Sequence, residues 1–382
     1  MKRSLFFGFV SVLLLAGCGD SESDDNQNPV SVSGRDTSDI TVYSSNEVMN
    51  FPREDMQGNL LCNNTASKFA TENFIIGSND NVSEATLTSI IASTQKSLNL
   101  HKATMGLTDT DLDLSNGEKL EICIATSEGR NGAGSMGGII VGTGRSGADL
   151  DLLLDHELVH TIGDRITGNA SISAYSHRWF DEGIAEMFSG DGVLTQMQMI
   201  ELLAGDDIPN PAQVEHKGAE DVWLFADKNA SYWYPAYNTT LHYLMSEGLT
   251  KTDIISIYKN FRTIHDACEA NMVAVYNDTG KGINIENKDG GPYSSAYYYG
   301  RIACFDKFRS DDPVRNEIDN LYPNVDLTSY RTLDPLGSGQ YVHSENIFEL
   351  ALNSVIGSTN VISYQNLKDN FNSLVTYGYL QN

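Results

Sequence analysis

Basic residues are scarce in this chain of 382 residues. Lysine and arginine together number 25, against 51 aspartates and glutamates, so the formal net charge is −26 at pH 7. A charge of this sign repels phosphate backbones and anionic lipid head groups. The composition therefore argues against a nucleic-acid-binding protein. A soluble, exposed surface explains the acidity more simply than a specific cationic partner does.

Long hydrophobic runs are also lacking. The N-terminal apolar run, residues 5–15, is too short to cross a bilayer as a mature helix. It follows Lys2 and Arg3 and ends in the letters LAGC at residues 15–18. A basic start followed by a short apolar run is typical of a signal peptide that is removed from the mature protein.

This N-terminal segment resembles the signal of bacterial lipoproteins. The resemblance implies a signal peptide over residues 1–17, a lipid on Cys18 and a membrane-anchored protein of the bacterial cell envelope. Gly19 stands where an aspartate often marks inner-membrane retention, so we expect the outer membrane. An ordinary secretory signal is the alternative. Residues 18–40 are acidic and rich in serine and asparagine, which predicts a disordered tether.

Cysteine is too sparse and too widely spaced for a cysteine-based metal site. Besides Cys18 the chain has only Cys62, Cys123, Cys268 and Cys304, and none has a C-x-x-C neighbour. Four cysteines in an oxidising compartment predict two disulfides, for which three pairings exist. Pairing within each half of the chain favours Cys62–Cys123 and Cys268–Cys304.

The spacing of apolar residues predicts an α+β protein with a mixed N-terminal sheet and a mostly helical C-terminal half. Short apolar runs predict a buried strand at residues 74–76 and another short strand at residues 139–141, and alternating faces predict a strand at residues 120–125. Helical spacing predicts helices at residues 81–107, 150–162, 180–188, 194–204, 234–247, 252–265 and 344–356. Gly163 is the expected end of the second helix. We therefore expect an α/β subdomain over residues 41–190 and a mainly helical one over residues 191–382.

Residues 155–160 read DHELVH and contain the pattern H-E-x-x-H. Side chains four residues apart share one face of a helix, so His156 and His160 can bind one metal ion. Zinc lowers the pKa of a bound water towards ~7, and a nearby carboxylate such as Glu157 can then take its proton. The short motif alone leaves an ordinary helix with two histidines as an alternative. A catalytic zinc also needs a third protein ligand.

A second motif supplies that ligand. Residues 179–186 read WFDEGIAE, with Glu182 placed 22 positions after His160. Together the two motifs resemble the gluzincin zinc metallopeptidases, above all microbial collagenases and peptidase MA-like proteins. The resemblance implies a thermolysin-like catalytic domain, zinc ligands His156, His160 and Glu182, and Glu157 as the general base. Glu186 is the alternative third ligand, but its position matches an acid that hydrogen-bonds a ligand histidine, and Asp181 can serve His160 similarly.

Other zinc peptidases are a poorer match. The metzincins carry a third histidine shortly after the second, whereas residues 161–166 read TIGDRI, so His177 is expected to be a loop residue. Gluzincins often use a tyrosine on a later helix to stabilise the oxyanion. The stretch from residue 234 to 244 resembles that helix, with Tyr234 at the family's position and Tyr237 as the alternative; either can also be a packed aromatic.

The kind of cleavage is indicated by a missing acid. Aminopeptidases of the group carry an acidic G-x-M-E-N segment that holds the substrate's free amine, whereas residues 134–138 here read GSMGG. This favours an endopeptidase acting on a peptide or protein substrate, which would lie along an edge strand at residues 138–142. The alternatives are an envelope binding or assembly lipoprotein that retains the fold without cleaving, and a zinc hydrolase of another class.

Overall fold

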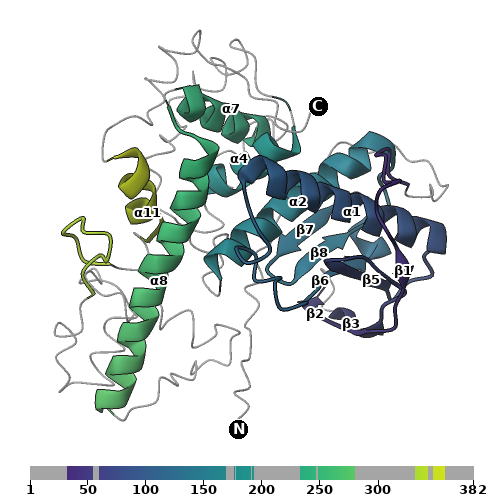
Figure 1. Cartoon of the computed structure of the whole chain (residues 1–382), viewed down its shortest axis with the longest axis horizontal. Coiled ribbons are helices and arrows are strands. Elements are labelled where there is room, and N and C mark those ends of the chain that lie inside the picture. The colour runs from purple at the N-terminus through teal and green to yellow at the C-terminus, as the bar shows by residue number, and fades with distance from the viewer. Residues whose placement is uncertain are drawn as a thin grey trace. The chain divides into compact units, whose positions relative to one another are not determined.

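The computed structural model describes residues 32–54, 60–168, 176, 178–190, 192, 233–246, 248–279, 332–342 and 347–357. The signal peptide, Cys18, His177, Cys304 and the helix expected at residues 194–204 lie outside these ranges. Within them the fold is mixed α/β, with a six-stranded mixed sheet, a two-stranded sheet and six α-helices (Figure 1). The expected combination of a mixed sheet and helices is therefore present.

The six-stranded sheet has the strand order β1-β4-β5-β6-β8-β7. Its strands are β1 (Tyr43–Ser44), β4 (Phe69–Ala70), β5 (Phe74–Ser78), β6 (Leu120–Ile124), β7 (Gly132–Ser135) and β8 (Gly138–Val141). β5, β6 and β8 are parallel, with Ile76 opposite Ile122 and Ile122 opposite Ile139. The residues of β8 and most of those of β5 are buried, which agrees with their continuous apolar runs, whereas β6 carries the half-buried Glu121 among buried neighbours.

The edge of the sheet next to β8 differs from the expectation. The strand expected at the edge, at residues 138–142, is internal, because β8 pairs with β6 on one side and with β7 on the other. β7 precedes β8 in the chain and pairs with it antiparallel, with Ser135 opposite Gly138 across a turn at Met136 and Gly137. β7 is therefore the outermost strand on this side of the sheet.

Two long helices, α1 (Glu84–Met105) and α2 (Gly147–Thr167), cover one face of the sheet (Figure 1). The Ser83 side chain caps α1 by accepting a hydrogen bond from the amide of Thr86 at 3.1 Å. The expected end of α2 at Gly163 is wrong. Ile166 continues the buried side of α2, and the helix ends at Gly168, whose amide donates to a carbonyl in the last turn.

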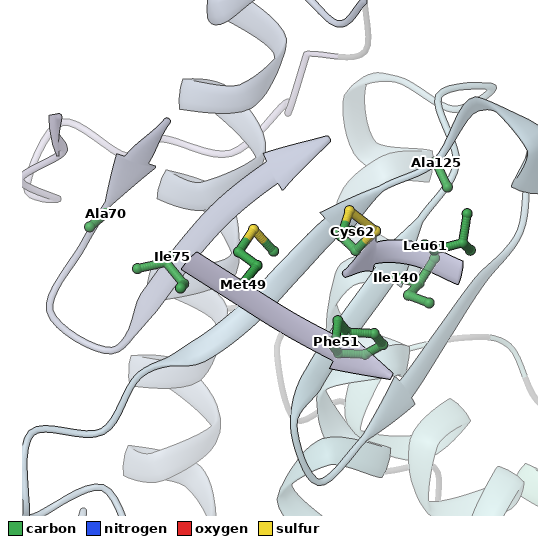
Figure 2. Packing of buried hydrophobic residues seen from close by; sticks show 9 residues of the cluster. Met49, Phe51, Leu61, Cys62, Ala70, Ile75, Ala125 and Ile140 are labelled. Carbon is green, nitrogen blue, oxygen red and sulfur yellow. A yellow bond between two sulfur atoms is a disulfide. The ribbon is translucent and has the colours of Figure 1, made fainter. Parts of the chain in front are cut away.

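A hairpin covers the opposite face of the sheet. Its strands are β2 (Val48–Glu54) and β3 (Leu60–Ala66), and its inner side chains pack on those of β5, β6 and β8. Figure 2 shows Met49 and Phe51 of β2 beside Ile75 and Ile140 of the sheet. The Cys62–Cys123 disulfide, one of the two pairings that the sequence favours, joins this hairpin to β6.

The N-terminal segment before β1 is part of the folded structure. The sequence predicts a disordered tether as far as residue 40, but residues 32–40 lie against α1 and α2. The amide of Gly147 donates to the carbonyl oxygen of Val32 at 2.6 Å, and Lys96 pairs with Asp39 at 2.6 Å. Composition indicated disorder here because the segment is polar. Polar side chains of the two helices bind it.

The remaining helices are α4 (Arg178–Ser189), α7 (Trp233–Ser246), α8 (Lys251–Thr279) and α11 (Ile347–Ile356). The chain divides into two compact units, residues 12–255 with 360–382, and residues 1–11 with 256–359. The first unit contains the six-stranded sheet with α1, α2, α4 and α7. The predicted subdomain boundary between residues 190 and 191 stays a prediction. None of the described helices is both long and apolar enough to cross a membrane.

The second unit contains most of α8 and all of α11. These helices contact each other through the side-chain amide of Asn260, which donates to the hydroxyl of Ser354 at 2.8 Å. Cys268 on α8 is disulfide-bonded. Cys304, the partner that the sequence predicts for it, lies outside the described residues, so this pairing stays a prediction.

Candidate metal centre

Helix α2 carries the H-E-x-x-H motif in its buried middle part. His156, Glu157 and His160 are 6%, 5% and 8% exposed. The i, i+4 spacing turns both imidazole rings to one side of the helix, and their centroids lie 5.0 Å apart. Charged and polar side chains are costly to bury unless they are paired, so this arrangement indicates a site that holds a charge.

Helix α4 packs against α2 and brings Glu182 to the two histidines. The Nε2 atom of His156 lies 3.2 Å from the Oε2 atom of Glu182 and 3.2 Å from the Nε2 atom of His160. The Nε2 atom of His160 lies 3.3 Å from the same carboxylate oxygen. The three donor atoms thus form a nearly equilateral triangle on the buried side of both helices.

This triangle fits a metal ion. Ligand bonds of about 2.0–2.1 Å in a tetrahedron place the donor atoms about 3.3 Å apart, which agrees with the three distances. The group His156, His160 and Glu182 therefore can hold a metal ion. The three protein donors lie on one side of the centre of such a tetrahedron, which leaves its fourth position for water or substrate.

The other nitrogen of each ring faces a second carboxylate. The Nδ1 atom of His156 lies 3.0 Å from Glu186, and the Nδ1 atom of His160 lies 3.3 Å from Asp181. A proton on each Nδ1 satisfies these carboxylates and leaves the Nε2 lone pairs facing each other. The geometry therefore separates two residues that the sequence left as alternatives: Glu182 lies with the donor triangle, and Glu186 lies behind His156.

Electrostatics at the site favour a cation. Burial lowers the pKa of His156, but the carboxylates of Glu182 and Glu186 outweigh this effect and raise the pKa to about 10. Burial also lowers the pKa of His160, whereas Asp181 and Glu182 raise it well above its usual value. The same field that stabilises a protonated imidazole stabilises a divalent ion at this position.

The two candidate tyrosines of α7 lie differently. The hydroxyl of Tyr234 lies 3.5 Å from the Oε1 atom of Glu182, and its ring packs edge-on to His156 with centroids 6.0 Å apart. Tyr237 is buried, and its ring lies 6.3 Å from that of Tyr234. Its backbone oxygen would be 2.9 Å from a Cβ atom added to Gly183. The hydroxyl of Tyr234 thus lies next to one of the candidate metal ligands.

The edge strand β7 lies directly against α2, the helix that carries the two histidines. A Cβ atom added to Gly134 would be only 2.0 Å from the backbone oxygen of Glu157, and one added to Gly132 would be 2.9 Å from the Cγ atom of Glu157. Both positions therefore need glycine for β7 and α2 to approach so closely. The sequence reasoning did not identify these two glycines as site residues. The signal that can find them is the glycine-rich segment at residues 131–138.

Comparison with known proteins adds no further information on this site. None of the protein-family models, curated proteins or solved structures compared with the chain gave a match.

Proposed function

We propose that this chain is a zinc-dependent peptidase with a gluzincin-like, thermolysin-like catalytic domain. The observation that carries the proposal is the triangle of donor atoms from His156, His160 and Glu182, with sides of 3.2–3.3 Å. Two imidazoles and one carboxylate form a ligand set typical of catalytic zinc, whereas magnesium and calcium prefer oxygen ligands. The spacing of the donors also fits the bond lengths of zinc.

The surrounding residues support hydrolysis. Zinc, when bound, acts as a Lewis acid that acidifies water and polarises a carbonyl group. Glu157 lies on the same helix as the two histidines and is proposed to accept a proton from the attacking water and pass it to the leaving amine. The hydroxyl of Tyr234 is proposed to donate a hydrogen bond to the carbonyl oxygen as it becomes negative. Glu186 and Asp181 keep the imidazoles oriented.

The position of β7 supports a peptide substrate. It is the outermost strand on its side of the sheet, and Gly132 and Gly134 hold it against Glu157. The outer edge of a strand offers amide and carbonyl groups that bind an extended peptide by main-chain hydrogen bonds. The turn after β7 contains Met136 and Gly137 and offers no carboxylate for a free amine. We therefore propose an endopeptidase.

The proposed location is the bacterial cell envelope, through a lipid on Cys18. The expected result is that the full-length protein sediments with membranes in a bacterial host and that Cys18→Ser shifts it to the soluble fraction. Sedimentation of the variant with membranes would contradict the lipid anchor without affecting the zinc site.

The decisive experiment compares zinc content and cleavage of a peptide library in matched variants. Wild type is expected to contain about one zinc per chain and to cleave the library, and Glu182→Ala is expected to lose the metal. Glu157→Gln is expected to retain zinc and lose cleavage, whereas Glu84→Gln, an exposed control on α1, is expected to keep both. Zinc without any cleavage by wild type would instead favour the binding or assembly lipoprotein or a hydrolase of another class.

A further inference from the structure

The contact between α1 and α2 contains a row of polar side chains. On α1, Ser89, Ser93 and Ser97 follow one another at intervals of four residues, and on α2, Asp151 and Asp155 do the same. Such spacing places each row on one face of its helix. Both aspartates are buried. Since burying a carboxylate costs free energy unless it is paired, something must compensate these two charges.

Residues 32–35, here called the N-terminal strap, bind Asp151. The hydroxyl of Ser33 donates to Asp151 at 2.6 Å, and the amide of Gly34 donates to its other oxygen at 2.9 Å. Ser93 of α1 donates a third hydrogen bond at 2.7 Å. The backbone amide of Ser33 also donates to the hydroxyl of Ser89 at 2.8 Å. The strap therefore contacts both helices through specific hydrogen bonds.

Arg35, the last residue of the strap, compensates the second aspartate. Its guanidinium donates two hydrogen bonds to the carboxylate of Asp155, at 2.9 and 2.5 Å, and Ser97 donates another. The side chains of Arg35 and Asp155 are 16% and 3% exposed, so the pair is largely shielded from water. Removing one partner of a buried ion pair lowers stability far more than removing one partner of an exposed pair, because the remaining charge is left buried and uncompensated.

We propose that Arg35 is a positioning residue for the metal centre. Asp155 directly precedes His156 on α2, and Gly134 of β7 closely approaches the backbone of Glu157 on the same helix. The strap therefore holds the turn of α2 that carries His156 at a set distance from Glu182 on α4. A small shift of this turn changes the donor spacing, on which metal affinity and catalysis depend. The inference rests on the proposed metal site.

The test uses the full-length chain and the variant Arg35→Met. We expect zinc affinity, measured by competition with a chelating dye, to fall about tenfold or more, and kcat for the cleaved peptide to fall with it. Hydrogen exchange of the metal-free protein is expected to rise in residues 151–160 and to stay unchanged in β5 and β6. The matched control is Lys96→Met, which removes an exposed ion pair of the same N-terminal segment. It is expected to leave zinc affinity, kcat and hydrogen exchange unchanged.

A second variant tests whether the effect passes through Asp155. Asp155→Asn weakens the same contact from its other partner, so adding it to Arg35→Met is expected to cause little further loss of zinc affinity. If Arg35→Met does not fold, Arg35→Lys takes its place with the same readouts and a smaller expected loss, because lysine keeps the charge without the two-pronged contact.

The outcomes separate this inference from the proposed function. A lower melting temperature with unchanged zinc affinity and unchanged exchange in α2 would show a merely structural role and overturn the inference. Separate, additive losses of affinity from the two substitutions would overturn the route through Asp155. If wild type binds no zinc, the proposed function fails, and the hydrogen exchange of α2 alone then decides whether Arg35 holds this helix.

Discussion

The ring of His156 lies between two carboxylates of α4, with its Nε2 atom 3.2 Å from Glu182 and its Nδ1 atom 3.0 Å from Glu186. These glutamates are four residues apart, so one helix face presents both of them to α2. Glu182 shares its oxygen with the Nε2 atom of His160, whereas Glu186 lies on the opposite side of the ring. The two carboxylates therefore have different proposed roles, one as ligand and one as support for the ligand.

Replacing Glu186 is expected to weaken zinc binding without abolishing it. Glu186→Gln keeps an acceptor for the Nδ1 proton but removes the negative charge, so we expect zinc affinity to fall roughly 10- to 100-fold. Titration with a chelating dye measures this, with Glu182→Ala, expected to lose zinc at stoichiometric concentrations, as the comparison. Complete loss of zinc in Glu186→Gln together with retention in Glu182→Ala would exchange the two roles.

The two tyrosines of α7 predict different kinetic effects. Tyr234→Phe removes the hydroxyl near Glu182, and we expect kcat to fall about 100-fold or more while zinc content is unchanged. Tyr237→Phe serves as the comparison on the same helix; because Tyr237 is buried, its effect is expected on stability rather than on kcat. Steady-state kinetics on one cleaved peptide checks both. Equal kcat values for wild type and Tyr234→Phe would remove this tyrosine from the mechanism.

The close approach of β7 to α2 predicts that the stability of the protein depends strongly on Gly134. An alanine there would place its Cβ atom 2.0 Å from the backbone oxygen of Glu157, so β7 and α2 must separate. We expect Gly134→Ala to lower the free energy of unfolding by about 1–3 kcal/mol or more in urea titrations. Gly137→Ala is the control, because the nearest atom, in the ring of Phe51, is 3.8 Å away. Equal stability of the two variants would contradict the packing of β7 on α2.

His101 on α1 predicts part of the pH dependence of stability. It is fully buried, neither ring nitrogen has a hydrogen-bond partner in the described part of the chain, and burial lowers its pKa to about 4. In the unfolded chain, His101 takes up a proton near pH ~6.5. The part of the free energy of unfolding that depends on a neutral His101 is therefore fully present above that pH. It is lost as the pH falls towards ~4, at about 1.4 kcal/mol per pH unit.

The variant His101→Leu tests this contribution. Its free energy of unfolding, measured in urea at several pH values between about 7 and about 5, is expected to fall less steeply than that of wild type. The difference between the two proteins cancels the titration of all other groups that the substitution does not affect. Parallel pH profiles would show that His101 does not titrate on unfolding in this range.

The local elements were predictable from the sequence where one periodicity dominates. The apolar runs at residues 74–76 and 139–141 correspond to β5 and β8, whose buried positions take apolar side chains, and the alternating stretch at residues 120–125 corresponds to β6. The helical spacing at residues 81–107 corresponds to α1, with the cap at Ser83. Glycine was a poorer guide to where a helix ends, since Gly163 lies inside α2 and the helix ends at Gly168.

For the candidate metal centre, too, some features were predictable from local sequence and others depended on tertiary packing. The placement of His156 and His160 on one face follows from the geometry of a single helix, so the motif alone indicates it. The choice between Glu182 and Glu186 depends on how α4 packs on α2. Both residues occupy the same face of α4, and one turn of the helix separates them. Only the distances to the two imidazoles distinguish them.

Sequence by itself determined the two motifs, the class of ligands and the three strands β5, β6 and β8 of the sheet, because these depend on spacing within a few residues. Tertiary structure decided that β7 rather than β8 is the edge strand, and that the N-terminal strap binds α2 through Arg35 and Asp155. These two residues are 120 positions apart in the chain. Contacts over such a separation depend on the packing of whole elements, which local periodicity does not encode.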